Sequence, residues 1–194
     1  MQGRVSVKRY RAVDLSLFAV ILMIFETILV RASNEWFPQE PWTVSAVAAI
    51  TAIVMVRWGL WAGLHAVLGG VVFVLTSHGS PSQYAIYGIG NLACLAVYPL
   101  LRRWGWEKLK EDVLVNFLYG ALVLLAMQVG RGVLSLLFGA APEIAPGFIT
   151  TDAISYIFTL AILWITARLD GMLEDQEHYL KRLNEQPEKE GGFQ

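Results

Sequence analysis

The chain has 194 residues, of which 56% are hydrophobic and only 16% are charged. A soluble domain usually carries about 25% charged residues, so the composition argues against a soluble globular protein. The net charge of −1 gives no reason to expect a nucleic-acid partner. Charged residues are concentrated in segments 1–14, 102–112 and 168–194, with long apolar stretches between them. The sequence therefore predicts an integral membrane protein in contact with the lipid bilayer.

Six apolar stretches are candidate membrane spans, since a helix needs about 20 apolar residues to cross the hydrocarbon core. In chain order they cover about residues 13–32, 43–56, 60–76, 83–101, 113–138 and 148–167. The second and third are short for complete crossings. They are separated only by Arg57-Trp58-Gly59, which predicts a tight helical hairpin. The first stretch is too long for a cleavable signal peptide, so we expect it to be retained.

The basic residues indicate the orientation, because cytoplasmic loops of membrane proteins are enriched in Lys and Arg. With the N-terminus in the cytoplasm, all of the 15 Lys and Arg residues except Arg31 and Arg131 fall on the inner side. The predicted fold is thus an all-α bundle of six transmembrane helices over residues 1–168, with both termini cytoplasmic. The predicted location is the cell membrane, as a multi-pass protein of prokaryotic type.

Residues 169–194 form a second predicted unit. Apolar and long side chains recur there at helical spacing, flanked by acidic residues, which predicts an amphipathic cytoplasmic helix. The spaced residues are Leu169, Met172, Leu173, Gln176, Leu180 and Leu183. From Asn184 onward the composition is typical of disorder.

Most of the polar side chains within the spans converge on the outer half of the membrane. A charge at this depth costs on the order of 3 kcal/mol, so it usually faces protein and has a partner. Counting about 1.5 Å per residue places most of these side chains in the outer half. They come from four spans and comprise Glu26, Tyr84, Tyr87, Asn91, Gln128, Arg131 and Asp152. Tyr84, Tyr87 and Asn91 share one helix face, as do Gln128 and Arg131.

This convergence has two interpretations. It predicts either an outward-opening pocket anchored by Glu26 and Arg131, or a buried ion pair of Glu26 with Arg131 or Arg31. The tryptophans near the outer ends of the first two spans are either interfacial anchors or a cover over a ligand site.

No catalytic or nucleotide-binding motif is found in the sequence: it lacks a P-loop, H-E-x-x-H and G-x-S-x-G. The histidines His65, His78 and His178 and the single Cys94 have no metal-site spacing. We therefore expect neither an enzyme nor a metal or cofactor site. If the protein takes part in powered transport, the energy must come from another subunit or an ion gradient.

Small residues mark faces where helices approach closely. They predict either internal packing or docking of another membrane protein. The stripes comprise Ala48, Ala49 and Ala52 in the second span and Gly59, Gly63, Ala66 and Gly70 in the third.

From about residue 10 to residue 170 the chain resembles the substrate-binding S components of energy-coupling-factor (ECF) vitamin transporters. The resemblance is carried by the six-span plan, by R-W-G-L-W-A-G-L-H-A-V-L-G-G at 57–70, by Y-G-I-G-N at 87–91 and by the polar outer half. It implies high-affinity binding of a vitamin or related micronutrient, and a membrane coupling subunit with two ATPase subunits as partners. The first span lacks the Ala-x-x-x-Ala that often docks on the coupling subunit, which points to spans two and three instead.

The resemblance, together with depth, implies a set of substrate-binding residues in the outer half. Arg131 suits a carboxylate or phosphate group of the substrate. The set comprises Glu26, Trp36, Tyr84, Tyr87, Asn91, Gln128 and Arg131.

Two other functions are compatible with the sequence. One is a non-transport membrane scaffold of the MreD cell-shape type, which uses helix faces and the cytoplasmic tail to hold partners. The other is a small membrane enzyme acting on lipid, with Glu26 or Asp152 as a base, against which the missing catalytic motif argues.

Overall fold

The computed structural model describes residues 6–38 and 43–185, and every regular element among them is a helix. The first half of the chain contains α1 (Val7–Trp36), α2 (Val47–Trp58), η1 (Gly59–Trp61), α3 (Ala62–Thr76), α4 (Pro81–Gln83), η2 (Tyr84–Ile89) and η3 (Asn91–Val97). The second half contains α5 (Tyr98–Trp104), α6 (Trp106–Glu111), α7 (Val113–Leu137), η4 (Pro142–Ile144), α8 (Gly147–Thr150), α9 (Ala153–Thr166) and α10 (Gln176–Glu185).

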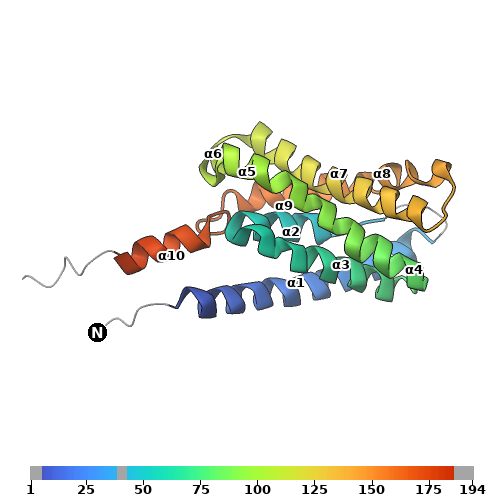
Figure 1. Cartoon of the computed structure of the whole chain (residues 1–194), viewed down its shortest axis with the longest axis horizontal. Coiled ribbons are helices and arrows are strands. Elements are labelled where there is room, and N and C mark those ends of the chain that lie inside the picture. Colours follow the sequence, from blue (N-terminus) through green and yellow to red (C-terminus); the bar gives the residue numbers. More distant parts are fainter. Residues whose placement is uncertain (1–5, 39–42, 186–194) are drawn as a thin grey trace, which may run out of the picture.

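Five helical segments within the described residues are long and apolar enough to span a membrane. They are Val7–Trp36, Val47–Thr76, Pro81–Trp104, Val113–Leu137 and Pro142–Thr166. They run along the long axis of the molecule (Figure 1). The prediction of an all-helical fold is confirmed for the described residues, and the prediction of six spans is met by five helical segments of sufficient length and apolar character.

The segment Val47–Thr76 folds back on itself at Gly59. Gly59 has a φ of +61°, a conformation that glycine adopts readily and other residues rarely do. A Cβ on Gly69 would lie 2.6 Å from Val47 Cγ2, whereas an unbroken helix would separate these residues by about 33 Å. The helical hairpin predicted at Arg57-Trp58-Gly59 is therefore present, with α2 and α3 side by side.

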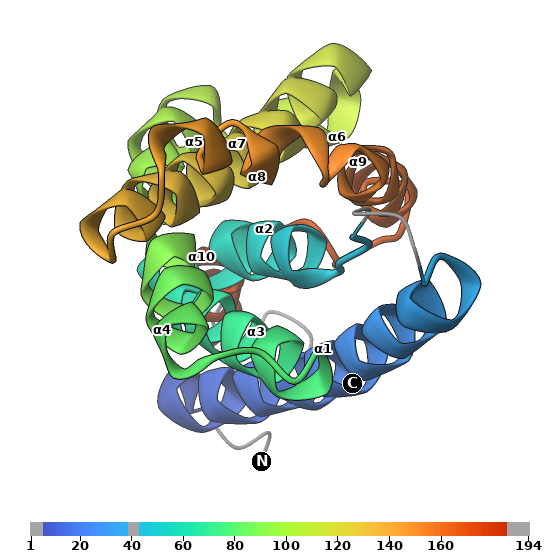
Figure 2. The ribbon, with the colours of Figure 1, turned by 90° about the vertical axis from the view of Figure 1, so that its right-hand side faces the viewer.

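Helix α2 forms the centre of the bundle, with all 12 of its residues buried. A helix that is apolar on all sides is typical of a core position. It contacts α1, α3, α7 and α9, which surround it (Figure 2). Ala48, Ala49 and Ala52 are at most 2% exposed, so this stripe serves internal packing. It offers no surface to a docking partner.

The glycine stripe of α3 is also internal. A Cβ on Gly63 would lie 3.2 Å from the side chains of Leu92 and Leu95 in η3, and one on Gly70 would lie 2.3 Å from the Tyr87 carbonyl oxygen. The small residues of both helices thus allow close helix packing within the chain.

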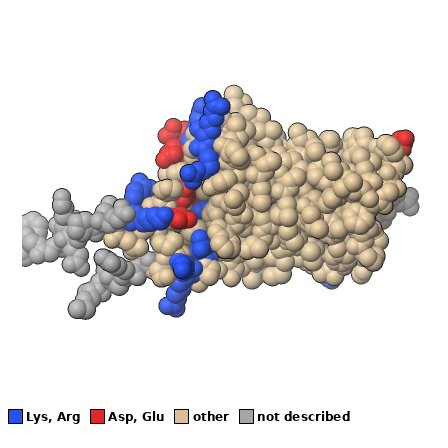
Figure 3. Space-filling view, in the orientation of Figure 1, with Lys and Arg blue, Asp and Glu red and all other residues tan. Residues whose placement is uncertain are grey.

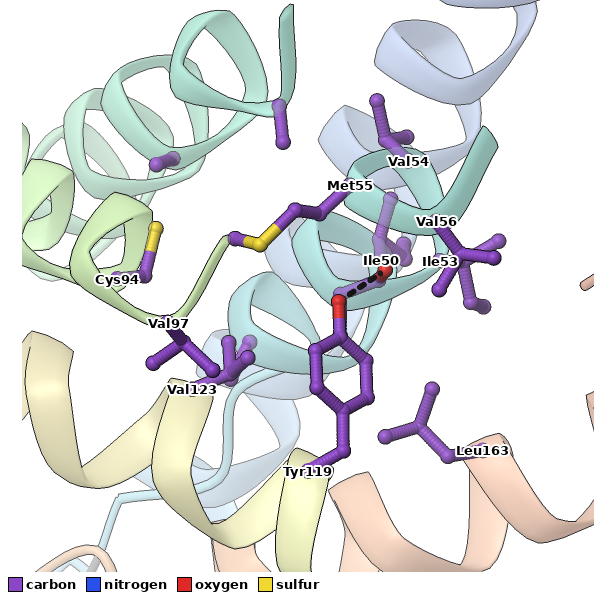
Figure 4. Close-up of a cluster of buried hydrophobic side chains, with 14 of the residues drawn as sticks. Ile50, Ile53, Val54, Met55, Val56, Cys94, Val97, Tyr119, Val123 and Leu163 are labelled. Atoms are coloured by element: carbon purple, nitrogen blue, oxygen red, sulfur yellow. Dashed lines mark hydrogen bonds between the residues drawn. The ribbon is translucent and has the colours of Figure 1, made fainter. Parts of the chain in front are cut away.

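The apolar core lies between α2 and the helices around it, and Tyr119 of α7 is its largest fully buried side chain (Figure 4). The Tyr119 hydroxyl donates a hydrogen bond to the Ala52 carbonyl at 2.9 Å. Met55, Val123 and Leu163 pack around it. Cys94 is fully buried in the same core, as expected for a packing residue.

Both described chain ends lie at one end of the bundle, where α1 begins and α10 is found (Figure 1). On the face drawn in Figure 3, Lys and Arg side chains gather at this same end, and the rest of the bundle surface is almost free of charge. We call this the basic end, and the opposite one the far end.

Arg57 joins three segments at the basic end, although it is only 5% exposed. Its Nε and Nη2 donate to the two carboxylate oxygens of Asp14 in α1, at 2.9 and 2.8 Å. Its Nη1 donates to the carbonyls of Gly171 and Met172, at 2.7 and 3.0 Å. The Trp58 indole donates to the same aspartate at 2.6 Å. The start of α1, the end of α2 and the segment after α9 are thereby held together.

We expect Arg57→Lys to lower the free energy of unfolding by about 1–3 kcal/mol. Lysine keeps the charge but lacks the planar guanidinium group, which donates to a carboxylate and two carbonyls at the same time. Thermal unfolding in detergent measures the effect. Arg168→Lys is the control, because that side chain is exposed and its guanidinium, which lies over the Trp164 ring, donates among the described residues only to the Trp164 carbonyl. Equal melting temperatures for Arg57→Lys and the unchanged protein would contradict the role given to Arg57.

The amphipathic helix predicted after residue 168 is present as α10, although it begins only at Gln176. Leu173, Gln176 and Leu180 are at most 4% exposed, because α10 lies against α2 and the start of α1. The predicted disordered tail falls mostly in residues 186–194, outside the described residues.

Candidate functional site

The segment Pro81–Trp104 is an irregular helix, and three predicted site residues, Tyr84, Tyr87 and Asn91, lie in its irregular part. Over Tyr84–Ile89 it is a π-helix, and over Asn91–Val97 it is a 3₁₀-helix. Wide π turns inside helices are frequently found at functional sites. Tyr87 lies in the π turn, and Asn91 begins the tighter helix that follows.

Two glycines bring this irregular helix against α7. A Cβ on Gly130 would lie 2.1 Å from the Gly90 carbonyl oxygen, and one on Gly90 would lie 2.9 Å from the Arg131 nitrogen. Real Cβ atoms essentially never come this close to backbone atoms, so only glycine permits this crossing. The crossing sets the next residues in each helix, Asn91 and Arg131, side by side.

Arg131 lies at the centre of a buried polar group and is only 4% exposed. Its Nε donates to Asn91 Oδ1 at 2.7 Å, and its Nη1 donates to Asp152 Oδ2 at 2.8 Å. The guanidinium carbon lies 4.9 Å from the centre of the Tyr87 ring. Asn91 is itself fixed by donating to the Ala66 carbonyl at 3.0 Å. The third guanidinium nitrogen, Nη2, has no hydrogen bond to a described residue.

Asp152 connects Arg131 to two further polar side chains. Its Oδ1 accepts a hydrogen bond from the Thr43 hydroxyl, and its Oδ2 accepts one from Gln128 Nε2 at 3.4 Å. The amide oxygen of Gln128 in turn accepts from the Tyr156 hydroxyl at 2.7 Å. These contacts define the Arg131 cluster, which consists of Tyr87, Asn91, Gln128, Arg131, Asp152 and Tyr156.

Glu26 is fully buried and interacts with the start of α2. Its Oε2 accepts from the Ala46 N–H at 2.8 Å, and the partial positive charge at a helix N-terminus favours a carboxylate there. Its Oε1 makes no hydrogen bond of normal geometry with a described residue. The Ser45 N–H donates to Ser155 Oγ, and this hydroxyl donates to the Thr43 carbonyl. Segment 43–46 thereby links Glu26 to the Arg131 cluster.

Aromatic rings line one side of the cluster. Tyr87 stacks on Phe73 of α3, with ring centres 4.6 Å apart. It also meets the edge of Phe148 of α8, with ring centres 5.9 Å apart. These contacts orient Tyr87 so that its ring lies against the guanidinium of Arg131.

The structure brings together four of the seven predicted site residues, namely Tyr87, Asn91, Gln128 and Arg131, and links Glu26 to them. Trp36 ends α1 with 73% of its surface exposed. Tyr84 is half-buried at the start of η2. Within the described part of the chain, neither hydrogen-bonds to the Arg131 cluster.

The ion pair that the sequence suggested for Arg131 exists with a different partner. Arg131 pairs with Asp152, and neither Glu26 nor Arg31 forms an ion pair among the described residues. Thr43, Ser155 and Tyr156 were not predicted. The sequence does contain a signal for the pairing with Asp152, because Asp152 lies at the outer start of the sixth predicted span and Arg131 lies near the outer boundary of the fifth.

His65 of α3 is buried and lies towards the basic end. Its Nε2 is 3.0 Å from the Leu15 carbonyl oxygen, which is consistent with a structural role. No group of three metal-binding side chains occurs in residues 6–38 and 43–185.

No family model matches the chain, and neither a curated protein nor a solved structure is significantly similar to it. The resemblance to ECF S components therefore rests on the sequence pattern alone.

Proposed function

We propose that the chain is the substrate-binding membrane subunit of an ATP-driven uptake transporter for a vitamin or related micronutrient, as in an ECF S component. In this proposal the five apolar segments make six spans, because Val47–Thr76 is a hairpin. The basic end then faces the cytoplasm of a prokaryotic cell. The Arg131 cluster lies in the outer half, and a membrane coupling subunit with two ATPases supplies the energy.

The observation that carries this proposal is a polar network with two atoms that make no hydrogen bond of normal geometry with a described residue. One is Arg131 Nη2, and the other is the fully buried Glu26 Oε1; the Ser45 side chain lies near this carboxylate. Buried polar atoms nearly always have partners, so exceptions need an explanation. A ligand with an anionic group for Arg131 and a donor for Glu26 would supply both partners, and the Tyr87 ring would contact its apolar part.

A membrane scaffold of the MreD type is the second candidate, and one observation favours it. The charge of Arg131 is already compensated by Asp152 at 2.8 Å, so the cluster is electrically complete without a ligand. In that case the polar network only fixes the relative positions of α7, α9 and the irregular helix.

Mass spectrometry of small molecules released from the purified protein in detergent separates the two functions. We expect a vitamin-like compound from the unchanged protein, and at least about tenfold less from Arg131→Lys, because one charge-assisted hydrogen bond is lost. Arg168→Lys, an exposed site at the basic end, is the matched control and should retain the compound.

Equal amounts of the compound from Arg131→Lys and Arg168→Lys would contradict substrate binding at the Arg131 cluster. A blank in all samples, together with a stoichiometric co-purifying membrane protein, would favour the scaffold.

A further inference from the structure

A cavity of about 400 Å³ lies at the basic end, remote from the Arg131 cluster. Its apolar floor is the end of α2, including Met55 and Val56, and its walls come from the α5–α6 turn and from α10. The volume falls within the range of small-molecule sites, about 300–1,000 Å³. Neither the proposed transport function nor the scaffold alternative uses this cavity.

Unpaired hydrogen-bond donors line the cavity. Arg102 of α5 and Arg182 of α10 both border it, and neither forms an ion pair with a described residue. Tyr98 and Trp106 also line it, and neither the Tyr98 hydroxyl nor the Trp106 indole N–H donates to a described group. The Tyr98 ring is held against Gly59, where an added Cβ would lie 2.9 Å from its hydroxyl oxygen.

Of the two acidic residues at the cavity, Asp175 is paired, whereas Glu107 forms no ion pair with a described residue. Asp175 pairs with His178 at 2.6 Å and accepts from the N–H groups of Glu177 and His178 at the start of α10. Glu107 lies in the first turn of α6, where the helix dipole favours a carboxylate. The cavity therefore offers more free donors than free acceptors.

We propose that this cavity binds the phosphate group of a phospholipid head group. A phosphate diester has acceptor oxygens and no donor, and guanidinium groups match its geometry. Basic pockets between membrane helices bind anionic head groups, and a tryptophan such as Trp106 is typical of the membrane interface. The apolar floor on α2 suits the glycerol and the first carbons of the acyl chains.

The test uses the full-length protein in detergent micelles with added dioleoylphosphatidylglycerol, and reads bound lipid by native mass spectrometry and the melting temperature. We expect Arg102→Gln and Arg182→Gln each to weaken binding at least about tenfold. Arg103→Gln is the matched control, since this exposed neighbour does not line the cavity. Dioleoylglycerol, which lacks the phosphate, should have no effect.

Glycerol 1-phosphate distinguishes a lipid from a soluble source of the phosphate. If glycerol 1-phosphate stabilises the protein as much as the lipid does, and Arg102→Gln and Arg182→Gln abolish the effect, the cavity is a phosphate-binding site whose ligand is soluble. Equal lipid binding by all three variants, or equal stabilisation by dioleoylglycerol, would overturn the proposal. If Arg102→Gln does not fold, Arg182→Gln decides the question, because α10 lies outside the membrane-spanning segments.

Discussion

Gly130→Ala is expected to destabilise the protein by about 3 kcal/mol or more. The added methyl group would lie 2.1 Å from the Gly90 carbonyl oxygen, and a backbone atom in a packed helix crossing cannot move away as a flexible side chain can. Overpacking of this kind typically costs about 1–3 kcal/mol and sometimes more. Thermal unfolding in detergent measures the loss.

The matched control is Gly132→Ala, two residues later on the same helix. Its added Cβ would have Ala145 Cβ as its nearest neighbour at 3.5 Å, which is an ordinary contact. Because alanine also favours a helix over glycine by about 1 kcal/mol, this variant should be as stable as the unchanged protein or slightly more so. A similar loss in both variants would show that the crossing at Gly90 and Gly130 is less tight than described.

Asp152→Asn is expected to cost about 3–5 kcal/mol, because it leaves the Arg131 guanidinium buried without its counter-charge. Both side chains of the pair are 5% exposed, so salt should screen the interaction little. The measurement is the free energy of unfolding of Asp152→Asn, Asp152→Leu, Arg131→Met and the double variant Arg131→Met with Asp152→Leu.

The double variant is the informative control. Replacing both members of a buried ion pair with apolar residues of similar volume is often neutral, so it should recover most of the stability that either single change loses. If the losses of the single variants simply add, the two side chains are not coupled, and the description of the Arg131 cluster fails.

Much of the polar cluster could be predicted from the sequence, because depth along a span is a simple count of residues. Most of the polar residues are predicted in this way to lie in the outer half, and Asn91, Gln128 and Arg131 do meet. The partner of Arg131 could not be predicted, because depth does not determine which helices are neighbours. Asp152 reaches Arg131 only because α9 packs directly against α7.

The contact between Asp14 and Arg57 shows the same limit at the basic end. Asp14 lies among basic residues near the N-terminus, where a carboxylate resembles an ordinary solvated charge. Its bond to Arg57 joins residues 43 positions apart and depends on how α1 packs on α2. From the sequence, Arg57 therefore indicates only that the turn between the second and third predicted spans lies on the inner side of the membrane.

Segment 43–46 was predicted to be helical, but α2 begins only at Val47. The backbone N–H of Thr43 donates instead to the Thr151 carbonyl, and that of Ser45 donates to Ser155 Oγ. These tertiary hydrogen bonds replace the first helical turn. No local pattern in T-V-S-A signals them, since the residues that accept the bonds are more than 100 positions away.

The enclosure of α2 has a consequence for how the protein is made. With 12 residues, α2 is about 18 Å long, which is too short to partition alone into a hydrocarbon core about 30 Å thick. If the protein spans a membrane as proposed, α2 enters the bilayer together with α3, as one inserting unit. Two of its neighbours, α7 and α9, are synthesised much later, so its final surroundings exist only after α9 has left the ribosome. The centre of the bundle is thus synthesised early and completed last.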